Sequence, residues 1–312
     1  MNENEFLEIV RNTAIRVLSR KGIFEDIVSE VTGGKMIRPR AIFAIANSFD
    51  VPDPNSFVPL AASTEIVHLA SLFHDDVIDN GMIRRGRPTL NARYGNLISI
   101  LAGDYFYSTA SHLVLENYPV EVARIFAHSV SYMTLMELKQ ATMRWNINLS
   151  QEEYFDIIRG KTGALFSASF ESAGVILGMD DTVCLHLREA GMLFGEIFQI
   201  TDDLLDFIGT KTGKIRLKDI SEGDITLPAI LLIEAEPEVR SLLMEYFSSK
   251  GERRDVIERL ASLIEKKNGY IDSIRRIVEE KRDLIDSHLS GIVGFNKDRF
   301  IPLLNSIIKR ER

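Results

Sequence analysis

The stretch EIVHLASLFHDDVID, residues 65–79, decides the fold of this chain. Its apolar residues recur at positions i, i+3, i+4, i+7 and i+11, which is the spacing of one face of an α-helix, and three carboxylates follow at its end. The same apolar spacing returns in IFQITDDLLDFI, residues 197–208. We find no convincing alternation of apolar and polar residues, which would be typical of strands, anywhere in the chain. The pattern therefore predicts an all-α protein.

The composition predicts that this all-α fold is a single-domain helical bundle that spans residues 1–312. Hydrophobic residues make up 45% of the chain, which is enough for a sizeable core, and the chain holds nine prolines, so helices can run unbroken over long stretches. No low-complexity tract or shift in composition marks a linker between domains. Signals for loops are confined to residues 33–34, 51–54, 80–88, 117–119 and 209–223.

Charge and cysteine content limit the classes of function. A net charge of −8 argues against broad nucleic-acid binding. Cys184 is the one cysteine, so an internal disulfide is excluded and a reducing cytoplasm is expected. The first residues lack the basic and apolar regions of a secretory signal, and no apolar run approaches the roughly 18 residues that a spanning helix needs. We therefore expect a cytoplasmic protein without a transmembrane segment and without a nucleic-acid partner.

Two copies of one acidic pattern indicate a metal site. The first copy holds Asp75, Asp76 and Asp79, and the second holds Asp202, Asp203 and Asp206. Each copy gathers three carboxylates at one helix end, where they repel one another unless a cation lies between them. Mg²⁺ prefers oxygen ligands and joins carboxylates to substrate phosphates. A solvated surface is the simpler explanation for one acidic cluster, but the repeated spacing favours a Mg²⁺-diphosphate site.

Other polar side chains accompany the two acidic motifs. On a helical wheel, His68 lies on the face of Asp75 and Asp79, about two turns before them. Gln199 lies on the equivalent face ahead of Asp202. Both faces therefore combine carboxylates with a neutral or titratable hydrogen-bonding group.

Basic residues lie where a diphosphate would need them. GGKMIRP, residues 33–39, places Lys35 and Arg38 after a flexible turn that lets the backbone approach an anion. RRGRP, residues 84–88, follows the first acidic motif after a short loop. Arginine suits bidentate contact with phosphate oxygens, and lysine acts as a point charge. Either patch alone would pass for an ordinary surface loop.

A third basic element, Lys161-Thr162-Gly163, lies in a helix-like stretch from residue 154 to 178. This stretch also carries Gly160 and Gly174, and each glycine inside a helix costs about 1 kcal/mol relative to alanine. A kink that frees carbonyl oxygens and a close packing of helices both explain these glycines. A further basic residue, Lys214, stands in the loop after the second acidic motif.

Seven motifs, in this order along the chain, resemble those of the trans-isoprenyl diphosphate synthases, the head-to-tail prenyltransferases, and in particular the long-chain polyprenyl diphosphate synthases. They are GGKMIRP, EIVHLASLFHDDVID, RRGRPTLN, AGDYF, KTGALF, GEIFQITDDLLD and GDITLP. One DDxxD motif is a weak signal, whereas seven ordered matches from about residue 33 to 228 are specific. The resemblance implies the isoprenoid synthase fold, an all-α bundle around a deep central cavity, and a homodimer.

The resemblance also implies a role for each matching residue. Two or three Mg²⁺ ions on the allylic diphosphate would be held by Asp75, Asp76, Asp79, Asp202, Asp203 and Asp206. The same diphosphate would be contacted by Arg84, Lys161 and Lys214. The diphosphate of isopentenyl diphosphate would be bound by Lys35, Arg38, His68 and Arg85. Thr162 and Gln199 would lie near the allylic carbon. The expected catalytic set is Asp75, Asp76, Asp202, Lys161, Thr162 and Gln199.

The implied reaction is the 1′-4 condensation of isopentenyl diphosphate with an allylic prenyl diphosphate. In such enzymes bulky aromatic residues one turn below the first acidic motif shorten the product, and here the corresponding residues are Ala70 and Ser71, with Val67 a turn further down. We therefore expect a long-chain product. The alternatives are a shorter-chain farnesyl or geranylgeranyl diphosphate synthase, a non-catalytic partner subunit, and a terpene cyclase of the same fold.

One residue departs from the family pattern. The family often has a lysine before TLP, as in Glu-Gly-Lys, whereas this chain has Glu222-Gly223-Asp224. The missing cation affects how the allylic diphosphate is held, and Lys218 is a neighbour that could compensate.

Overall fold

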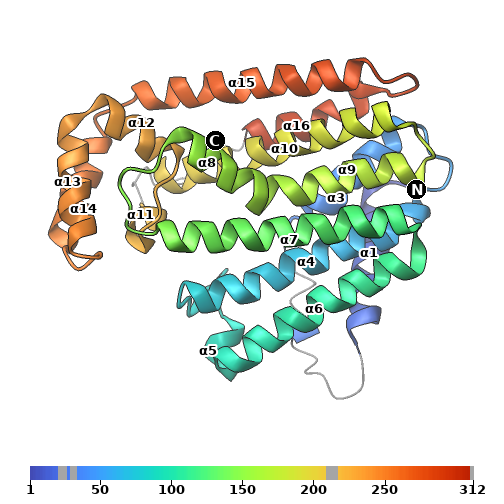
Figure 1. Ribbon diagram of the computed structural model, residues 1–312, viewed down its shortest axis with the longest axis horizontal. Coiled ribbons are helices and arrows are strands. Elements are labelled where there is room, and N and C mark those ends of the chain that lie inside the picture. Colours follow the sequence, from blue (N-terminus) through green and yellow to red (C-terminus); the bar gives the residue numbers. More distant parts are fainter. Residues whose placement is uncertain (20–26, 29–33, 209–216, 310–312) are drawn as a thin grey trace. The chain divides into compact units, whose positions relative to one another are not determined.

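The computed structural model describes residues 1–19, 27–28, 34–208 and 217–309. Over these ranges the chain is helical throughout apart from short connections and one minimal hairpin (Figure 1), and the prediction of an all-α protein is confirmed. The N-terminal half contains α1 (Glu3–Leu18), α3 (Ile37–Ser48), α4 (Val58–Ile78), α5 (Leu90–Tyr94), α6 (Asn96–Asn117) and α7 (Val120–Met143). The rest contains α8 (Gln151–Ile158), α9 (Ala164–Ile176), α10 (Asp181–Ile208), α11 (Lys218–Glu222), α12 (Leu227–Ala235), α13 (Pro237–Ser248), α14 (Arg254–Ile264), α15 (Gly269–Ser290) and α16 (Ile301–Ile308).

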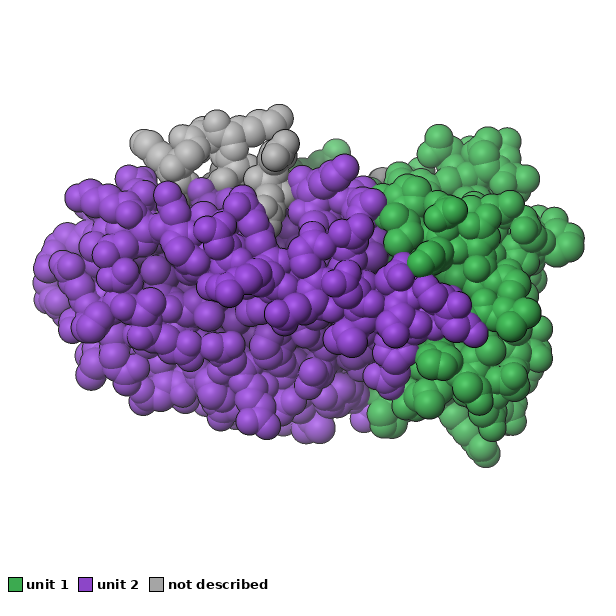
Figure 2. All heavy atoms as spheres, turned by 90° about the horizontal axis from the view of Figure 1, so that it is seen from above, with its two compact units in different colours: residues 1–130, 168–188, 292–303 green, residues 131–167, 189–291, 304–312 purple. Residues whose placement is uncertain are grey.

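The chain divides into two compact units (Figure 2). The first comprises Met1–Val130, Ala168–Arg188 and Ile292–Leu303, and the second comprises Ser131–Ser167, Glu189–Gly291 and Leu304–Arg312. Four of the boundaries fall inside α7, α9, α10 and α16 rather than in loops. The single domain expected from the sequence stays a prediction.

Helix α4 is the buried helix of the first unit that carries the first acidic motif. It packs against α1, α3 and α6, the last lying beside it in Figure 1. The Phe73 ring meets the Phe106 ring of α6 edge-on at 5.1 Å between centroids, and the Ser99 hydroxyl donates to the Phe73 carbonyl at 2.9 Å. Packing on several sides explains why α4 is apolar far beyond one face.

The helix that ends in the first acidic motif is also long and apolar enough to cross a membrane, by length and composition alone. Among the described residues it is the one such segment, Pro54–Ile78, which corrects the expectation that no run of this length exists. In the most apolar 18-residue stretch of this segment, 72% is buried inside the protein. That burial is the behaviour of a core helix.

A hairpin of two short strands, which the sequence analysis did not predict, follows α4. Strands β1 (Ile83–Arg84) and β2 (Arg87–Pro88) pair antiparallel, with Arg84 opposite Arg87. The two turn residues, Arg85 and Gly86, have φ angles of +51° and +77°. Positive φ at both central residues is the requirement of a type I′ turn, the turn that matches the twist of a hairpin.

In the second unit, the glycine-rich stretch forms both a π turn and a close helix contact. Residues Arg159–Gly163 form a π-helix between α8 and α9. A Cβ on Gly160 would lie 2.1 Å from Cγ of Met136, and a Cβ on Gly195 would lie 2.5 Å from Cα of Gly163. The sequence left a kink and close packing as alternatives, and the structure contains both.

Gly191 offers a test of this close packing. A Cβ there would lie 2.7 Å from the Phe166 carbonyl oxygen and 2.8 Å from Cα of Ser167, and backbone atoms cannot yield as a flexible side chain can. We expect Gly191→Ala to lower the free energy of unfolding by about 1–3 kcal/mol, measured by urea denaturation. Gly269→Ala is the control, because a Cβ at this first residue of α15 meets nothing within 4 Å. Equal unfolding midpoints for the two variants would contradict the expectation.

Candidate active site

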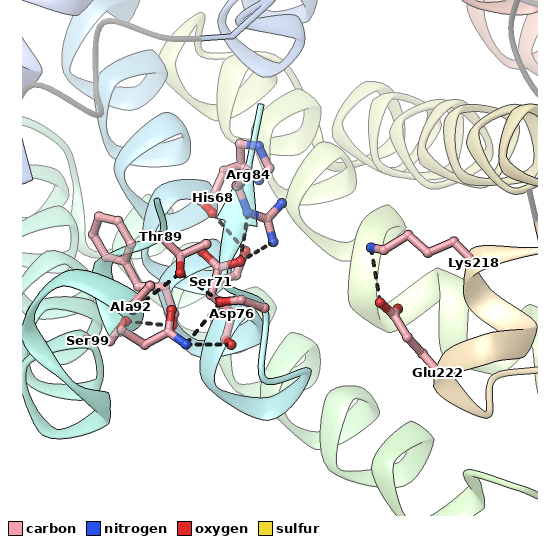
Figure 3. A network of polar contacts seen from close by, with 12 residues as sticks. His68, Ser71, Asp76, Arg84, Thr89, Ala92, Ser99, Lys218 and Glu222 are labelled. Atoms are coloured by element: carbon pink, nitrogen blue, oxygen red, sulfur yellow. Dashed lines mark hydrogen bonds and ion pairs between the residues drawn. The ribbon is translucent and has the colours of Figure 1, made fainter. Parts of the chain in front are cut away.

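The first acidic motif lies at the C-terminal end of α4. Asp76 is 6% exposed, and its Oδ1 accepts a hydrogen bond from Nε of Arg84 at 2.9 Å and lies 2.8 Å from Nη2 of the same residue (Figure 3). Asp75 and Asp79 are half-buried, and the Asp79 N–H donates to the Asp75 carbonyl at 2.8 Å. The structure therefore brings the predicted Arg84 onto the predicted aspartate cluster.

Two side chains that the sequence analysis did not single out hold the turn between α4 and β1. Asn91 Nδ2 donates to the carbonyls of Asp76, at 3.2 Å, and of Gly81, at 3.1 Å. Thr89 Oγ1 donates to the Gly81 carbonyl at 2.7 Å. These bonds fix the course of the chain that carries Arg84 back to Asp76. Both residues belong to the motif RRGRPTLN, which was the available signal.

Three of the four residues expected to bind isopentenyl diphosphate are electrostatically coupled in the first unit. Burial lowers the pKa of His68 well below its usual value, and the charges of Arg38, Arg85 and Arg84 lower it further. His68 is therefore a neutral imidazole at pH 7, able to donate one hydrogen bond. The fourth residue, Lys35, is exposed, and its carbonyl accepts a hydrogen bond from Nε of Arg40 at 2.9 Å.

The residues expected to set product length lie on α4 below the aspartates. Val67 and Ala70 are fully buried at 0% exposure. Ser71 is half-buried, and its hydroxyl donates to the His68 carbonyl at 2.8 Å. All three side chains are small, as the sequence indicates.

The second acidic motif lies near the C-terminal end of α10, and Asp203 is its most buried member at 5% exposure. Its carboxylate accepts hydrogen bonds from the Tyr154 hydroxyl at 2.6 Å and from Gln199 Nε2 at 2.8 Å. Burial, and after it the charges of Asp202 and Asp206, raise the pKa of Asp203 to about 7 against the lowering effect of these two bonds. The carboxylates of this motif therefore repel one another.

The π turn brings the predicted Thr162 to the predicted Gln199 of this network and directs the predicted Lys161 to α7. Thr162 Oγ1 donates to Gln199 Oε1 at 2.5 Å, so the glutamine amide is fixed between Thr162 and Asp203. Lys161 Nζ lies 2.7 Å from a carboxylate oxygen of Glu137 on α7. The sequence analysis missed Tyr154 and Glu137, because neither stands in a recognisable motif.

A buried ion network anchors the start of the π turn. Glu196 on α10 is 1% exposed and accepts a hydrogen bond from Nε of Arg159 at 2.8 Å. Its other oxygen pairs with Lys281 of α15. Lys281 Nζ also lies 4.5 Å from the centroid of the Phe155 ring. Two cations on separate helices thus compensate one buried carboxylate beside the residues predicted to be catalytic.

The segment after the second acidic motif adds further carboxylates. The Asp219 N–H donates to Asp206 Oδ2 at 3.1 Å, and burial, with the charges of Asp203 and Asp206, raises the pKa of Asp219 well above its usual value. Asp224 lies 3.7 Å from Nη2 of Arg144. The Lys218 ammonium lies 3.3 Å from Glu222 (Figure 3).

The predicted Lys214 lies outside the described residues. Asp219 was also not identified from the sequence, because its distance from Asp206 along the chain hides their contact.

The donor chemistry of both motifs fits a hard divalent cation. Within the described ranges, no group of three or more His, Cys, Asp or Glu side chains is arranged to hold a metal ion. The acidic side chains nevertheless offer oxygen ligands only, and the raised pKa of Asp203 reflects burial and repulsion that a cation would relieve. Oxygen-only sites suit Mg²⁺ and Ca²⁺ rather than zinc.

Comparison with known proteins identifies the family. Residues 21–264 match the family model described as polyprenyl synthetase. The octaprenyl diphosphate synthase of Escherichia coli (strain K12) is 30% identical over 306 residues, which cover 96% of this chain and 92% of that protein. This match spans both acidic motifs and the helices after residue 264.

Solved structures with the same fold extend over almost the whole chain. The decaprenyl diphosphate synthase of Rhodobacter capsulatus superposes with a TM-score of 0.87 and 29% identity, covering 99% of this chain and 97% of that one. A polyprenyl synthase of Caulobacter crescentus CB15, complexed with calcium and isoprenyl diphosphate, gives a TM-score of 0.89 and 26% identity, covering 99% and 96%. The predicted isoprenoid synthase fold is confirmed by these matches. The chain, as its ordered motifs predict, belongs to the polyprenyl synthetase family.

Proposed function

We propose that this enzyme is a head-to-tail trans-prenyltransferase that condenses isopentenyl diphosphate with an allylic prenyl diphosphate. The allylic C1′–O bond breaks, a bond forms from C1′ to C4 of isopentenyl diphosphate, a proton leaves that substrate, and diphosphate is released. The observation that carries the proposal is the hydrogen-bonded chain from Thr162 through Gln199 to Asp203. In this chain the side-chain amide of Gln199 links its own carbonyl oxygen, which accepts from Thr162, to the second aspartate motif. Relatives named as octaprenyl and decaprenyl diphosphate synthases support it.

The metal in the proposal is Mg²⁺, as two or three ions held by the six aspartates of the two motifs. When bound, these ions neutralise the negative charge that grows on the departing diphosphate. The proposal requires both motifs to act on the same diphosphate, in a deep apolar cavity that excludes water from the allylic cation. Arg84, Lys161 and Lys214 are the proposed contacts to that diphosphate.

The chain's own residues supply the other proposed roles. The Gln199 amide is oriented by a donor on one side and an acceptor on the other, and its proposed role is to direct its carbonyl oxygen at the positive charge that develops on the allylic carbon. Lys35, Arg38 and Arg85 provide charge for the diphosphate of isopentenyl diphosphate, and neutral His68 provides a hydrogen bond. Because donors set in advance need no reorganisation during the reaction, they stabilise the transition state more than water does.

A long-chain product is the second part of the proposal. Val67 and Ala70 are small and fully buried, and Ser71 is small as well. Space below the first acidic motif would let the hydrocarbon chain grow past this level. The names of the octaprenyl and decaprenyl diphosphate synthases given above denote long-chain products of this kind.

We also propose a homodimer that uses an exposed stripe of α6. Leu97, Leu101 and Leu115 are 68%, 54% and 60% exposed, and their spacing places them on one face of the helix. Ile100, at 41% exposure, borders the same face. A stripe of large apolar side chains along one helix is typical of a surface that another protein covers. A second copy of the chain is the proposed occupant.

The aspartates provide the test of the reaction itself. Asp75→Ala and Asp202→Ala should each reduce turnover by a factor of about 100 or more, because each removes charge that stabilises the leaving group. The assay incubates the purified chain with Mg²⁺, isopentenyl diphosphate and allylic primers of several lengths. Asp283→Ala, at an exposed position of α15, is the control. Near-normal turnover in either site variant, or none in the unaltered chain alone, would refute the assignment, and the latter would favour a partner subunit.

Product length is tested by filling the space beside α4. Ala70→Phe should shift the products toward shorter chains, because a ring at this buried position blocks the path of the growing hydrocarbon. The dephosphorylated products of the variant and the unaltered enzyme are sized by chromatography. Tyr105→Phe, on α6, keeps a ring of the same size and serves as the control. An unchanged distribution of products in Ala70→Phe would contradict the proposed wall.

The dimer is tested on its proposed surface. Leu101→Glu should shift the protein toward the mass of one chain in sedimentation experiments, because a carboxylate at the centre of an apolar interface loses its hydration. Leu284→Glu is the matched control, since Leu284 is a leucine of another helix, α15, with a similar exposure of 51%. Identical masses for both variants would rule out the α6 stripe as the interface.

A further inference from the structure

The N-terminal helix contributes an arginine to the motif GGKMIRP. Nη2 of Arg11, on α1, lies 3.5 Å from Sδ of Met36. A thioether is a weak acceptor, and the buried Nε of Arg11 has no hydrogen-bond partner in the part of the chain that the structure describes. Arg11 also precedes the residues 21–264 that match the family model. A guanidinium with several donors and one weak contact is suited to an anion.

A second arginine, Arg85, contacts the motif GGKMIRP at Gly34. A Cβ on Gly34 would lie 3.1 Å from Nη1 of Arg85, so the absent side chain is what lets this guanidinium approach the backbone. Gly34 also has φ of +99°, where other residues are strained. Residues 34–36 are therefore in contact with one arginine from the hairpin and one from α1.

A buried carboxylate accompanies these arginines. Glu65 on α4 is 3% exposed and stands one turn before His68. Burial raises the pKa of Glu65, and the charges of Arg38, Arg85 and Arg11 act against that rise. Three guanidinium groups thus act on one carboxylate, beside a neutral imidazole. Guanidinium groups and a hydrogen-bond donor are the groups that bind a diphosphate.

We propose that Arg11 is a further binding residue for the diphosphate of isopentenyl diphosphate, and that Glu65 is a positioning residue that holds Arg11, Arg38 and Arg85 around it. The inference rests on the proposed function. It assigns α1 a direct part in the site, through Arg11, and it gives a buried acid next to an anion site a reason to be there. Glu65 acts through the arginines and does not touch the substrate.

Arg11 is tested by its effect on one substrate of the two. Arg11→Met should raise KM for isopentenyl diphosphate about tenfold or more, since a hydrogen bond to a charged group is lost, and should leave KM for the allylic substrate unchanged. Arg11→Lys should restore part of the affinity, because it keeps the charge. Arg16→Met, at an exposed position on the same helix, is the control. An unchanged KM for isopentenyl diphosphate in Arg11→Met would overturn the inference.

Glu65→Gln separates a positioning role from a simple charge effect. If Glu65 acted by charge alone, its removal would strengthen the binding of an anion. Loss of positioning instead predicts weaker binding of isopentenyl diphosphate, measured by calorimetry without the allylic substrate and without turnover. Thermal unfolding of the variant shows whether the fold is kept, and weaker binding with an unchanged melting temperature supports the role. Equal or tighter binding in Glu65→Gln would contradict it.

The same experiments distinguish failure of the inference from failure of the proposed function. If the unaltered enzyme neither binds isopentenyl diphosphate nor extends any primer, the proposed function fails and the inference fails with it. If the unaltered enzyme does both while Arg11→Met and Arg16→Met behave alike, the inference alone is overturned.

Discussion

The constraint on which the site depends is the burial of carboxylates at the ends of apolar helices. Asp76 on α4 and Asp203 on α10 are both almost inaccessible to water, so each needs a compensating group from the protein or from a ligand. Arg84 compensates Asp76, whereas Asp203 receives two hydrogen bonds and, among the residues that the structure describes, no ion pair with a cation, and its pKa rises to about 7. The hairpin after α4 carries Arg84 to Asp76, and the π turn before α9 places Thr162 against Gln199, one of the two donors to Asp203.

The sequence predicted the parts of the site that are local in the chain. The spacing within residues 65–79 and 197–208 predicted two buried helices ending in aspartates, and the structure contains both. Arg84 reaches Asp76 because it lies in the first strand of the hairpin, only a short turn after the end of α4. These relations need nothing beyond helix periodicity and short loops.

Partners that are distant in the sequence could not be predicted in this way. Tyr154 meets Asp203, and Arg11 meets Met36, through the packing of separate helices, which no spacing rule reveals. The glycines around Lys161 show the same limit. Their presence indicated a departure from a regular helix, but it did not distinguish a kink from a close packing of helices. The minimal strands were missed for a further reason, since two residues are too few to show alternation.

Lys281 shows how far the support of the site extends along the chain. It shares Glu196 with Arg159, yet it lies in α15, past residue 264, where the family model ends. A shortened protein cut at that limit would retain every recognisable motif and lose half the counter-charge of an acid that is 1% exposed. The recognisable motifs therefore do not contain the whole support of the site, which extends at least to Lys281.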